Sequence, residues 1–232
     1  MSTAEHPHRI AVPPLVEGDR LDQPEFHRRY DAMPPDTHAE LIQGVVFMPS
    51  PVGPEHGRAH VPALVWLSYY AENTPGVETL DNTSTVLGPK SEPQPDAVLR
   101  ILTEYGGRSQ TDRRFVRGVP ELVMEVSHTT RFADLGPKRD DYERAGVREY
   151  VVRALEPDEV LWHVLQDGRL VVVAPDADGL YRSRAFPGLW LDPVALVSGD
   201  TRGLRAAVDR GLATAEHAQF VDRLAANRVT GG

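Results

Sequence analysis

The sequence predicts an α/β fold in which a central mixed β-sheet is flanked by helices, with an antiparallel meander at one end and a C-terminal helix. A strand, helix, strand succession between residues 122 and 152 is the signature of a right-handed parallel crossover. Apolar runs at residues 160–165 and 170–173 flank an Asp167-Gly168 pair, which marks an antiparallel hairpin. Apolar residues at helical spacing from Leu204 to about Ala226 indicate one or two C-terminal helices.

The chain is expected to hold one main domain, at residues 21–200. Residues 1–20 carry several prolines among polar residues and are predicted to form a flexible N-terminal arm. Residues 201–232 are predicted to be a helical segment that packs on the same domain or extends from it. The elements expected before residue 105 are a helix at 22–30, a strand at 41–48 with a bulge at Gly44, a helix at 55–72, and strands at 77–80, 84–87 and 96–102.

The second half begins with residues 106–118, which are polar and arginine-rich and predict an irregular connection. A buried strand is expected at residues 122–126. The helix that follows lies within residues 132–146, with Pro137 in its first turn and Gly146 just past its end. A strand at residues 149–152 then completes the crossover.

Composition and net charge exclude several classes of function. The net charge of −9 argues against a broad surface that coats nucleic acid, because such surfaces depend on Lys and Arg. It does not exclude a nuclease, since a bound metal supplies local positive charge. The chain has no cysteine, which excludes disulfides, thiolate zinc sites and thiol nucleophiles. No apolar run approaches the roughly 20 residues of a membrane helix, so we expect a cytoplasmic protein without a membrane partner.

Acidic residues stand at the ends of predicted strands or within them. Glu40 directly precedes one apolar run, Asp96 opens another, and Glu125 lies among valine and methionine in a third. A carboxylate at a buried position is costly without a partner, and a hard divalent cation that takes oxygen ligands is a suitable one. Lys138 lies near the start of the helix that follows Glu125. The four residues together fit a metal-dependent site that cleaves phosphodiesters.

In this order the residues resemble the PD-(D/E)XK nuclease superfamily, and within it the Uma-type family of bacterial proteins described as restriction endonucleases. Each matching segment is short, and the ordered set is what makes the resemblance specific. The segments are Glu40–Gly44, the Ser50-Pro51…Glu55-His56 turn, Pro95–Ala97, Leu122–Ser127, Asp134–Lys138, Tyr142–Tyr150 and Phe186–Leu191.

The resemblance implies a restriction-endonuclease-like fold in which neighbouring strands present Asp96 and Glu125 to Mg²⁺ or Mn²⁺. The backbone carbonyl of Val126 is implied as a further metal ligand. Lys138 is implied to orient the attacking water or to stabilise developing negative charge, with Glu40 assisting. DNA is the substrate that this resemblance implies, and the active form of many such nucleases is a homodimer.

Two positions depart from the family pattern. The superfamily's usual Glu-x-Lys would place lysine at position 127, where this chain has Ser127, so the lysine role passes to Lys138. Arg153 stands where relatives ordinarily carry aspartate after the strand, which raises the question of altered activity or altered partner contact.

Other readings of these residues remain open at this stage. Lys138 could pair only with Asp134 or Asp141 across a helical turn. His56 could lie near the site at the start of a helix or could be a packed histidine. The arginines at 108, 113, 114 and 117 could face nucleic acid or form a solvated loop. The alternative function is a catalytically inactive or accessory protein of the same fold that binds nucleic acid or a protein partner.

Overall fold

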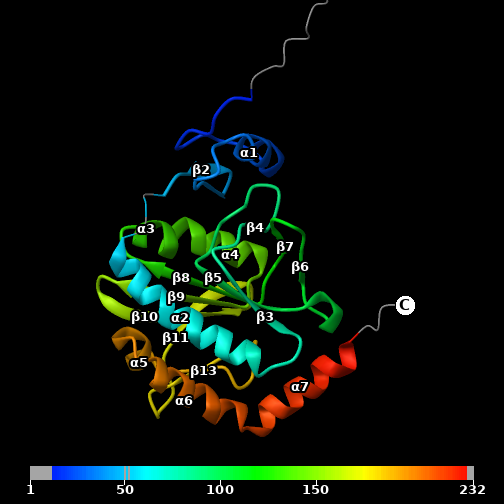
Figure 1. The fold of residues 1–232 in the computed structure, drawn as a ribbon, viewed down its shortest axis with the longest axis vertical. Coiled ribbons are helices and arrows are strands. Elements are labelled where there is room, and N and C mark those ends of the chain that lie inside the picture. Colours follow the sequence, from blue (N-terminus) through cyan, green and yellow to red (C-terminus); the bar gives the residue numbers. More distant parts are fainter. Residues whose placement is uncertain (1–11, 50, 52, 229–232) are drawn as a thin grey trace, which may run out of the picture.

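The centre of the protein is a six-stranded mixed sheet (Figure 1). The computed structural model describes residues 12–49, 51 and 53–228. The spatial order is β11-β10-β9-β8-β5-β3. These strands are β3 Val77–Asp81, β5 Ala97–Ile101, β8 Leu122–Ser127, β9 Glu149–Leu155, β10 Asp158–Gln166 and β11 Arg169–Val173. Strands β8 and β9 are parallel, whereas every other neighbouring pair is antiparallel. The predicted mixed sheet with an antiparallel meander at one end is confirmed.

Side chains alternate between the two faces of this sheet, as the pleat of a strand requires. Leu99 of β5 and Met124 of β8 pack in the larger core, together with α2 Pro54–Glu72 and the helices α5 Pro193–Ser198, α6 Thr201–Leu212 and α7 Ala215–Asn227. Val98 and Val123 point to the opposite face and pack near Tyr142 of α4 Arg139–Ala145. Helix α2 crosses one face in Figure 1, and α5 to α7 follow it in orange and red.

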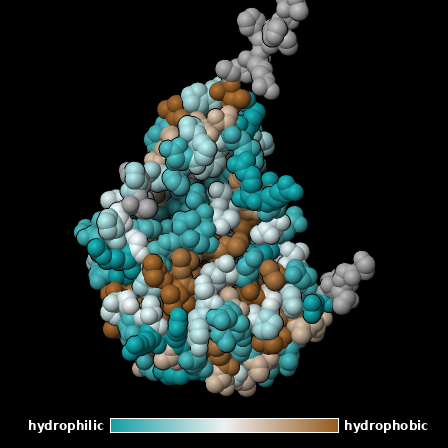
Figure 2. All heavy atoms as spheres, viewed as in Figure 1, coloured by the Kyte–Doolittle hydropathy of each residue, from teal (hydrophilic) through white to brown (hydrophobic). Residues whose placement is uncertain are grey.

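The C-terminal helices belong to the same core as the sheet. Leu204 and Val208 of α6 and Phe220 and Leu224 of α7 are buried in the larger core cluster. Each helix begins at a residue whose side chain accepts backbone N–H bonds: Asp192 for α5, Asp200 for α6 and Thr214 for α7. The outer face of this layer keeps some apolar surface, visible in Figure 2 where α2 crosses the sheet.

A single strand at residues 41–48 was predicted, and that prediction is wrong. The chain forms a hairpin of β1 Glu40–Ile42 and β2 Val45–Phe47, with Gln43 at φ 55° and Gly44 at φ 78° in the turn. Two consecutive left-handed residues reverse the chain as in a two-residue hairpin loop. The hairpin and α1 Gln23–Tyr30 form the small cap drawn in blue in Figure 1.

The first eleven residues of the predicted N-terminal arm lie outside the described residues. The remainder of that segment packs against the cap. Leu15 is buried in the cluster that contains Phe26, and the backbone N–H of Gly18 donates to the carbonyl of Val46 at 2.9 Å.

The arginine-rich segment is more regular than predicted. It contains β6 Ser109–Thr111 and β7 Val116–Gly118, which pair with β4 Thr85–Val86 in a small separate sheet. The remaining short elements are the 3₁₀ turn η1 Thr103–Tyr105 and the paired strands β12 Tyr181–Arg182 and β13 Trp190–Leu191.

The helix expected within residues 132–146 is broken into three parts. These are α3 Arg131–Ala133, a π-helical turn η2 Asp134–Lys138, and α4. Gly136 has φ −115° and ψ −107°, a non-helical conformation directly before Pro137. Proline disfavours helical backbone in the residue before it, which explains the break. Lys138 is thereby placed at the N-terminus of α4. No helix among the described residues combines the length and apolar character needed to cross a membrane.

Candidate metal site at the edge of β5 and β8

The register of β5 and β8 brings the two predicted ligands together. Ala97 pairs with Met124 in this antiparallel ladder, so the residue before Ala97 lies beside the residue after Met124. These residues are Asp96 and Glu125, and the backbone N–H of Asp96 donates to Oε2 of Glu125 at 3.4 Å. Both carboxylates therefore lie side by side where β5 begins and β8 ends.

The Asp96 side chain is held by the backbone of the neighbouring strand. Its Oδ2 accepts from the N–H of Val126 at 2.6 Å, and its Oδ1 lies 3.2 Å from Nε2 of His56 on α2. Burial raises the pKa of Asp96, but the hydrogen bond from His56, its charge and the Val126 N–H outweigh burial and leave the pKa below its usual value. The group is therefore set up as an anion.

The Glu125 side chain is buried and projects toward α4. Its Oε1 accepts from the hydroxyl of Tyr142 at 2.9 Å and lies 2.8 Å from Nζ of Lys138. Burial raises the pKa of Glu125 strongly; Lys138 lowers it, while the nearby charges of Asp96, Asp134 and Glu40 raise it further. A glutamate in this environment gains from a cation placed against its other oxygen.

The ammonium of Lys138 contacts carboxylates from three different elements. Its ammonium lies 3.0 Å from Oε1 of Glu40 on β1, 2.8 Å from Oε1 of Glu125 on β8, and 3.7 Å from Oδ1 of Asp134 on the preceding turn. Burial alone would lower the pKa of Lys138, but these carboxylates raise it well above its usual value, so the ammonium stays charged. The interpretation that Lys138 pairs only across its own helical turn is therefore wrong.

Glu40 is fixed from two sides. Its Oε1 accepts the backbone N–H of Gln94 at 2.7 Å in addition to its contact with Lys138. This bond ties the β1 hairpin to the segment that leads into Asp96. Glu40 thus positions Lys138 and the approach to β5.

The charge of this cluster is unbalanced. Four carboxylates, of Glu40, Asp96, Glu125 and Asp134, are each 9% exposed or less, and the cationic groups in contact with them are Lys138 and His56. Excess buried negative charge is costly unless a cation neutralises it. Each ligand candidate also gives one carboxylate oxygen to a firm protein contact, Oδ2 of Asp96 to Val126 and Oε1 of Glu125 to Lys138. The oxygen-rich donor set fits a hard divalent ion.

Two histidines on α2 approach the same aspartate. Nε2 of His56 lies within 3.3 Å of both carboxylate oxygens of Asp96, and Nε2 of His60 lies 3.0 Å from its backbone carbonyl. His56, His60 and Asp96 form a group whose ligand atoms all lie within 4.8 Å of one another. Of the two sequence interpretations of His56, the structure supports a helix-start residue beside the site.

Three further residues contact the cluster without having been predicted as site residues: Asp134, His56 and Tyr142. Asp134 belongs to the Asp-Leu-Gly pattern and lies four residues before Lys138, so the spacing alone indicated their contact at 3.7 Å. His56 shares no ligand spacing with Asp96 in the sequence. The spacing of Lys138 and Tyr142 by one helical turn was a usable signal, since it puts both on the face of α4 that meets Glu125.

Arg153 does not contact this cluster among the described residues. Its guanidinium pairs with Asp158 and donates to the backbone carbonyls of Ala154 and Val197. The guanidinium of Arg153 is thus bonded to β9, β10 and α5.

The arginine cluster is largely engaged in local ion pairs. Arg114 lies 2.7 Å from Asp31, Arg117 lies 2.8 Å from Asp112, and Arg108 lies 3.4 Å from Glu121. The pairs of Arg114 and Arg117 are exposed and therefore weak, whereas Glu121 is buried.

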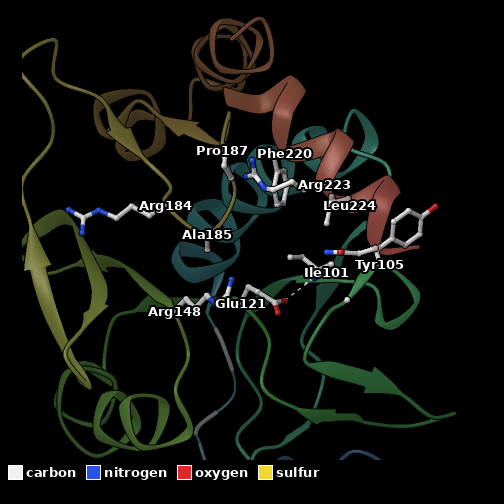
Figure 3. A pocket seen from close by; sticks show the side chains of 12 residues that line it. Ile101, Tyr105, Glu121, Arg148, Arg184, Ala185, Pro187, Phe220, Arg223 and Leu224 are labelled. Carbon is white, nitrogen blue, oxygen red and sulfur yellow. Dashed lines mark hydrogen bonds between the residues drawn. The ribbon is translucent and has the colours of Figure 1, made fainter. Parts of the chain in front are cut away.

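A separate cavity of about 260 Å³ lies at the opposite end of β8 (Figure 3). Glu121 at its floor accepts the backbone N–H of Ile101, and Phe220 and Arg223 of α7 line its other side. None of Glu40, Asp96, Glu125 and Lys138 lines this cavity. The candidate metal site therefore lies apart from this cavity.

Comparisons with known proteins agree with this architecture. The sequence profile of the Uma2 family, described as "Putative restriction endonuclease", matches residues 23–194, and no curated protein matches the chain. The fold is similar to that of a crystal structure described as a "putative nuclease belonging to DUF820" from Anabaena variabilis. That similarity has a TM-score of 0.51 at 12% identity and covers 78% of this chain and 97% of the other. Because the matched segment spans most of the chain and includes Glu40, Asp96, Glu125 and Lys138, the protein belongs to the Uma2 family.

Proposed function

We propose that this protein is a Mg²⁺- or Mn²⁺-dependent endonuclease that hydrolyses phosphodiester bonds in DNA. The observation that carries the proposal is the excess of buried negative charge at the adjoining ends of β5 and β8, where Asp96 and Glu125 stand side by side. Asp96, Glu125 and the backbone carbonyl of Val126 would hold the ion. Membership of the Uma2 family supports a nuclease as the class of enzyme.

The bound ion would activate a water and neutralise charge on the scissile phosphate. The chain's own groups then have separate tasks. Lys138 presents a permanent ammonium 2.8 Å from Glu125, close enough to the ligand set to orient a water or to stabilise charge that develops on phosphate. Glu40 keeps that ammonium in place through its own contact at 3.0 Å.

Tyr142 and the Val126 N–H act as positioning groups. Tyr142 fixes one oxygen of Glu125 and Val126 fixes one oxygen of Asp96, so the second oxygen of each carboxylate would be left to hold the ion. Fixing ligand orientation in this way costs no reorganisation when substrate arrives.

The test combines calorimetric metal titration with cleavage of supercoiled and single-stranded DNA. Wild-type protein is expected to bind Mg²⁺ or Mn²⁺ and to nick or linearise the plasmid. Asp96→Asn and Glu125→Gln are expected to lose both properties. Glu104→Gln, which changes an exposed carboxylate at the other end of β5, serves as the matched control and should behave as wild type.

An accessory role is the second candidate, and the acidic net charge of −9 favours it. In that role the protein would bind metal and yet leave naked DNA intact at physiological salt. Metal binding without cleavage of any DNA or RNA form in the assay above would therefore replace the nuclease proposal with this one.

A homodimer is part of the proposal because two sites are needed to address two strands. The edge strand β11 supports it by leaving Val171 and Val172 exposed, at 38% and 60%. Light scattering coupled to gel filtration should give twice the monomer mass, and Val172→Lys should reduce it to the monomer value.

A further inference from the structure

His56 is held at the mouth of the candidate metal site by the geometry of α2. It lies in the first turn of that helix, and its side chain is 14% exposed. Nε2 is 3.2 Å from Oδ1 of Asp96 and 3.3 Å from Oδ2. The imidazole therefore faces both carboxylate oxygens of Asp96, one of the groups proposed to hold the ion.

The spacing of these atoms suits ligands of one ion. Two neighbouring ligands of an octahedral ion with bonds of about 2.1 Å are about 3.0 Å apart. The distance of 3.2 Å between Nε2 of His56 and Oδ1 of Asp96 is close to that value. An ion could join the two atoms with little movement of either side chain.

His60, one helical turn later, makes other contacts with the same ring nitrogen. Its Nε2 lies 3.0 Å from the backbone carbonyl of Asp96, which can only accept, so this nitrogen must donate. The same nitrogen lies 3.3 Å from Oδ1 of Asp81. His60 thus positions the backbone of Asp96, whereas His56 faces the carboxylate.

We infer that Nε2 of His56 is a direct ligand of the ion and that the site consequently selects Mn²⁺ over Mg²⁺. This inference rests on the proposed function for the location of the ion. Mg²⁺ favours oxygen ligands and gives up water reluctantly, whereas imidazole is a ligand for first-row transition ions. Mn²⁺ combines acceptance of nitrogen with the octahedral, oxygen-rich coordination that Asp96, Glu125 and Val126 offer.

The direct test is electron spin-echo envelope modulation spectroscopy on the Mn²⁺-loaded full chain. Wild-type protein should show nitrogen-14 modulation from a coordinated imidazole. His56→Gln and His56→Ala should both lose it. His38→Gln, which changes an exposed histidine, is the matched control and should retain it.

A second measurement compares the two ions by titration. His56→Gln should lower Mn²⁺ affinity by about tenfold or more, a loss seen even for outer partners of metal ligands. Its amide oxygen remains a suitable ligand for Mg²⁺, so the affinity for that ion should change much less. In His56→Gln, the dissociation constant for Mg²⁺ divided by that for Mn²⁺ should therefore fall toward one.

The inference is overturned if wild-type protein binds no Mn²⁺, shows no nitrogen modulation, or keeps its ion preference in both His56 variants. These outcomes are distinct from failure of the proposed function. If Mn²⁺-loaded protein shows the histidine signal but leaves nucleic acid uncut, the proposed nuclease activity is contradicted and the assignment of His56 as a ligand is not. If wild type and His56→Gln both cleave with the same ion preference, only the assignment of His56 as a ligand is contradicted.

Discussion

The ammonium of Lys138 lies 2.8 Å from Oε1 of Glu125, and the two side chains are 7% and 4% exposed. This buried ion pair links α4 to the end of β8. Through Glu40, the same lysine also contacts the β1 hairpin. The site and the stability of the fold thus depend on the same lysine.

Lys138→Met should destabilise the protein by about 3–5 kcal/mol, because it leaves buried carboxylates without their cation. Urea unfolding measures this loss. Added Mn²⁺ should restore part of it, since an ion that binds only the folded state stabilises that state. Lys90→Met removes an exposed lysine and should change stability by no more than about 0.5 kcal/mol. Equal stabilities of the two variants would contradict the role given to Lys138.

Gly44→Ala should destabilise the hairpin that carries Glu40. Gly44 has φ 78°, and a left-handed conformation costs about 1–2 kcal/mol for a residue with a side chain. The new Cβ would also lie 3.1 Å from the carbonyl oxygen of Leu21. Thermal or urea unfolding measures the change.

The control for this substitution is Gly57→Ala within α2, where an added Cβ meets nothing within 4 Å. Alanine there should stabilise the protein by about 0.4–1 kcal/mol. If both substitutions change the free energy of unfolding in the same direction, the left-handed backbone at Gly44 does not determine the effect of Gly44→Ala.

His163 should make stability depend on pH. Burial lowers its pKa, and the bond from Nδ1 to the carbonyl of Tyr150 only partly offsets burial. Below its unfolded pKa of about 6.5 the unfolded chain takes up the proton more readily. This contribution to stability is present above pH 6.5 and is lost as the pH falls from there toward the lowered folded-state pKa.

Urea unfolding between pH 8 and pH 5 compares wild type with His163→Gln. The variant should show a shallower fall in unfolding free energy with decreasing pH. Identical slopes would mean that His163 titrates alike in the two states.

The sheet and most of its helices could be predicted because their signals are local. Apolar runs located β5, β8 and β10, Asp22 as an N-terminal cap located α1, and helical spacing located α2. The hairpin at Gln43-Gly44 lacks the Asn-Gly or Asp-Gly pair that usually marks such turns, so its two strands were read as one. Strands β6 and β7 are short and polar, and they are strands because β4 from elsewhere in the chain pairs with β7.

The site was predictable to a lesser degree. Asp96 and Glu125 are conspicuous as acids beside buried strands, and the register of β5 with β8 then explains their contact. His56 lies far from them in the sequence and reaches Asp96 only because α2 packs across the sheet. Helical spacing indicated the contact of Lys138 with Asp134, whereas its contacts with Glu40 and Glu125 join different elements and are not encoded in local periodicity.

The proposed function depends on a divalent ion bound between Asp96 and Glu125. Anomalous scattering from crystals of the wild-type protein soaked in Mn²⁺ measures whether an ion binds there. One strong anomalous peak is expected in contact with carboxylate oxygens of Asp96 and Glu125 and with the carbonyl oxygen of Val126, and it should be absent in Glu125→Gln. A peak confined to other residues, or no peak at saturating Mn²⁺, would contradict this proposal.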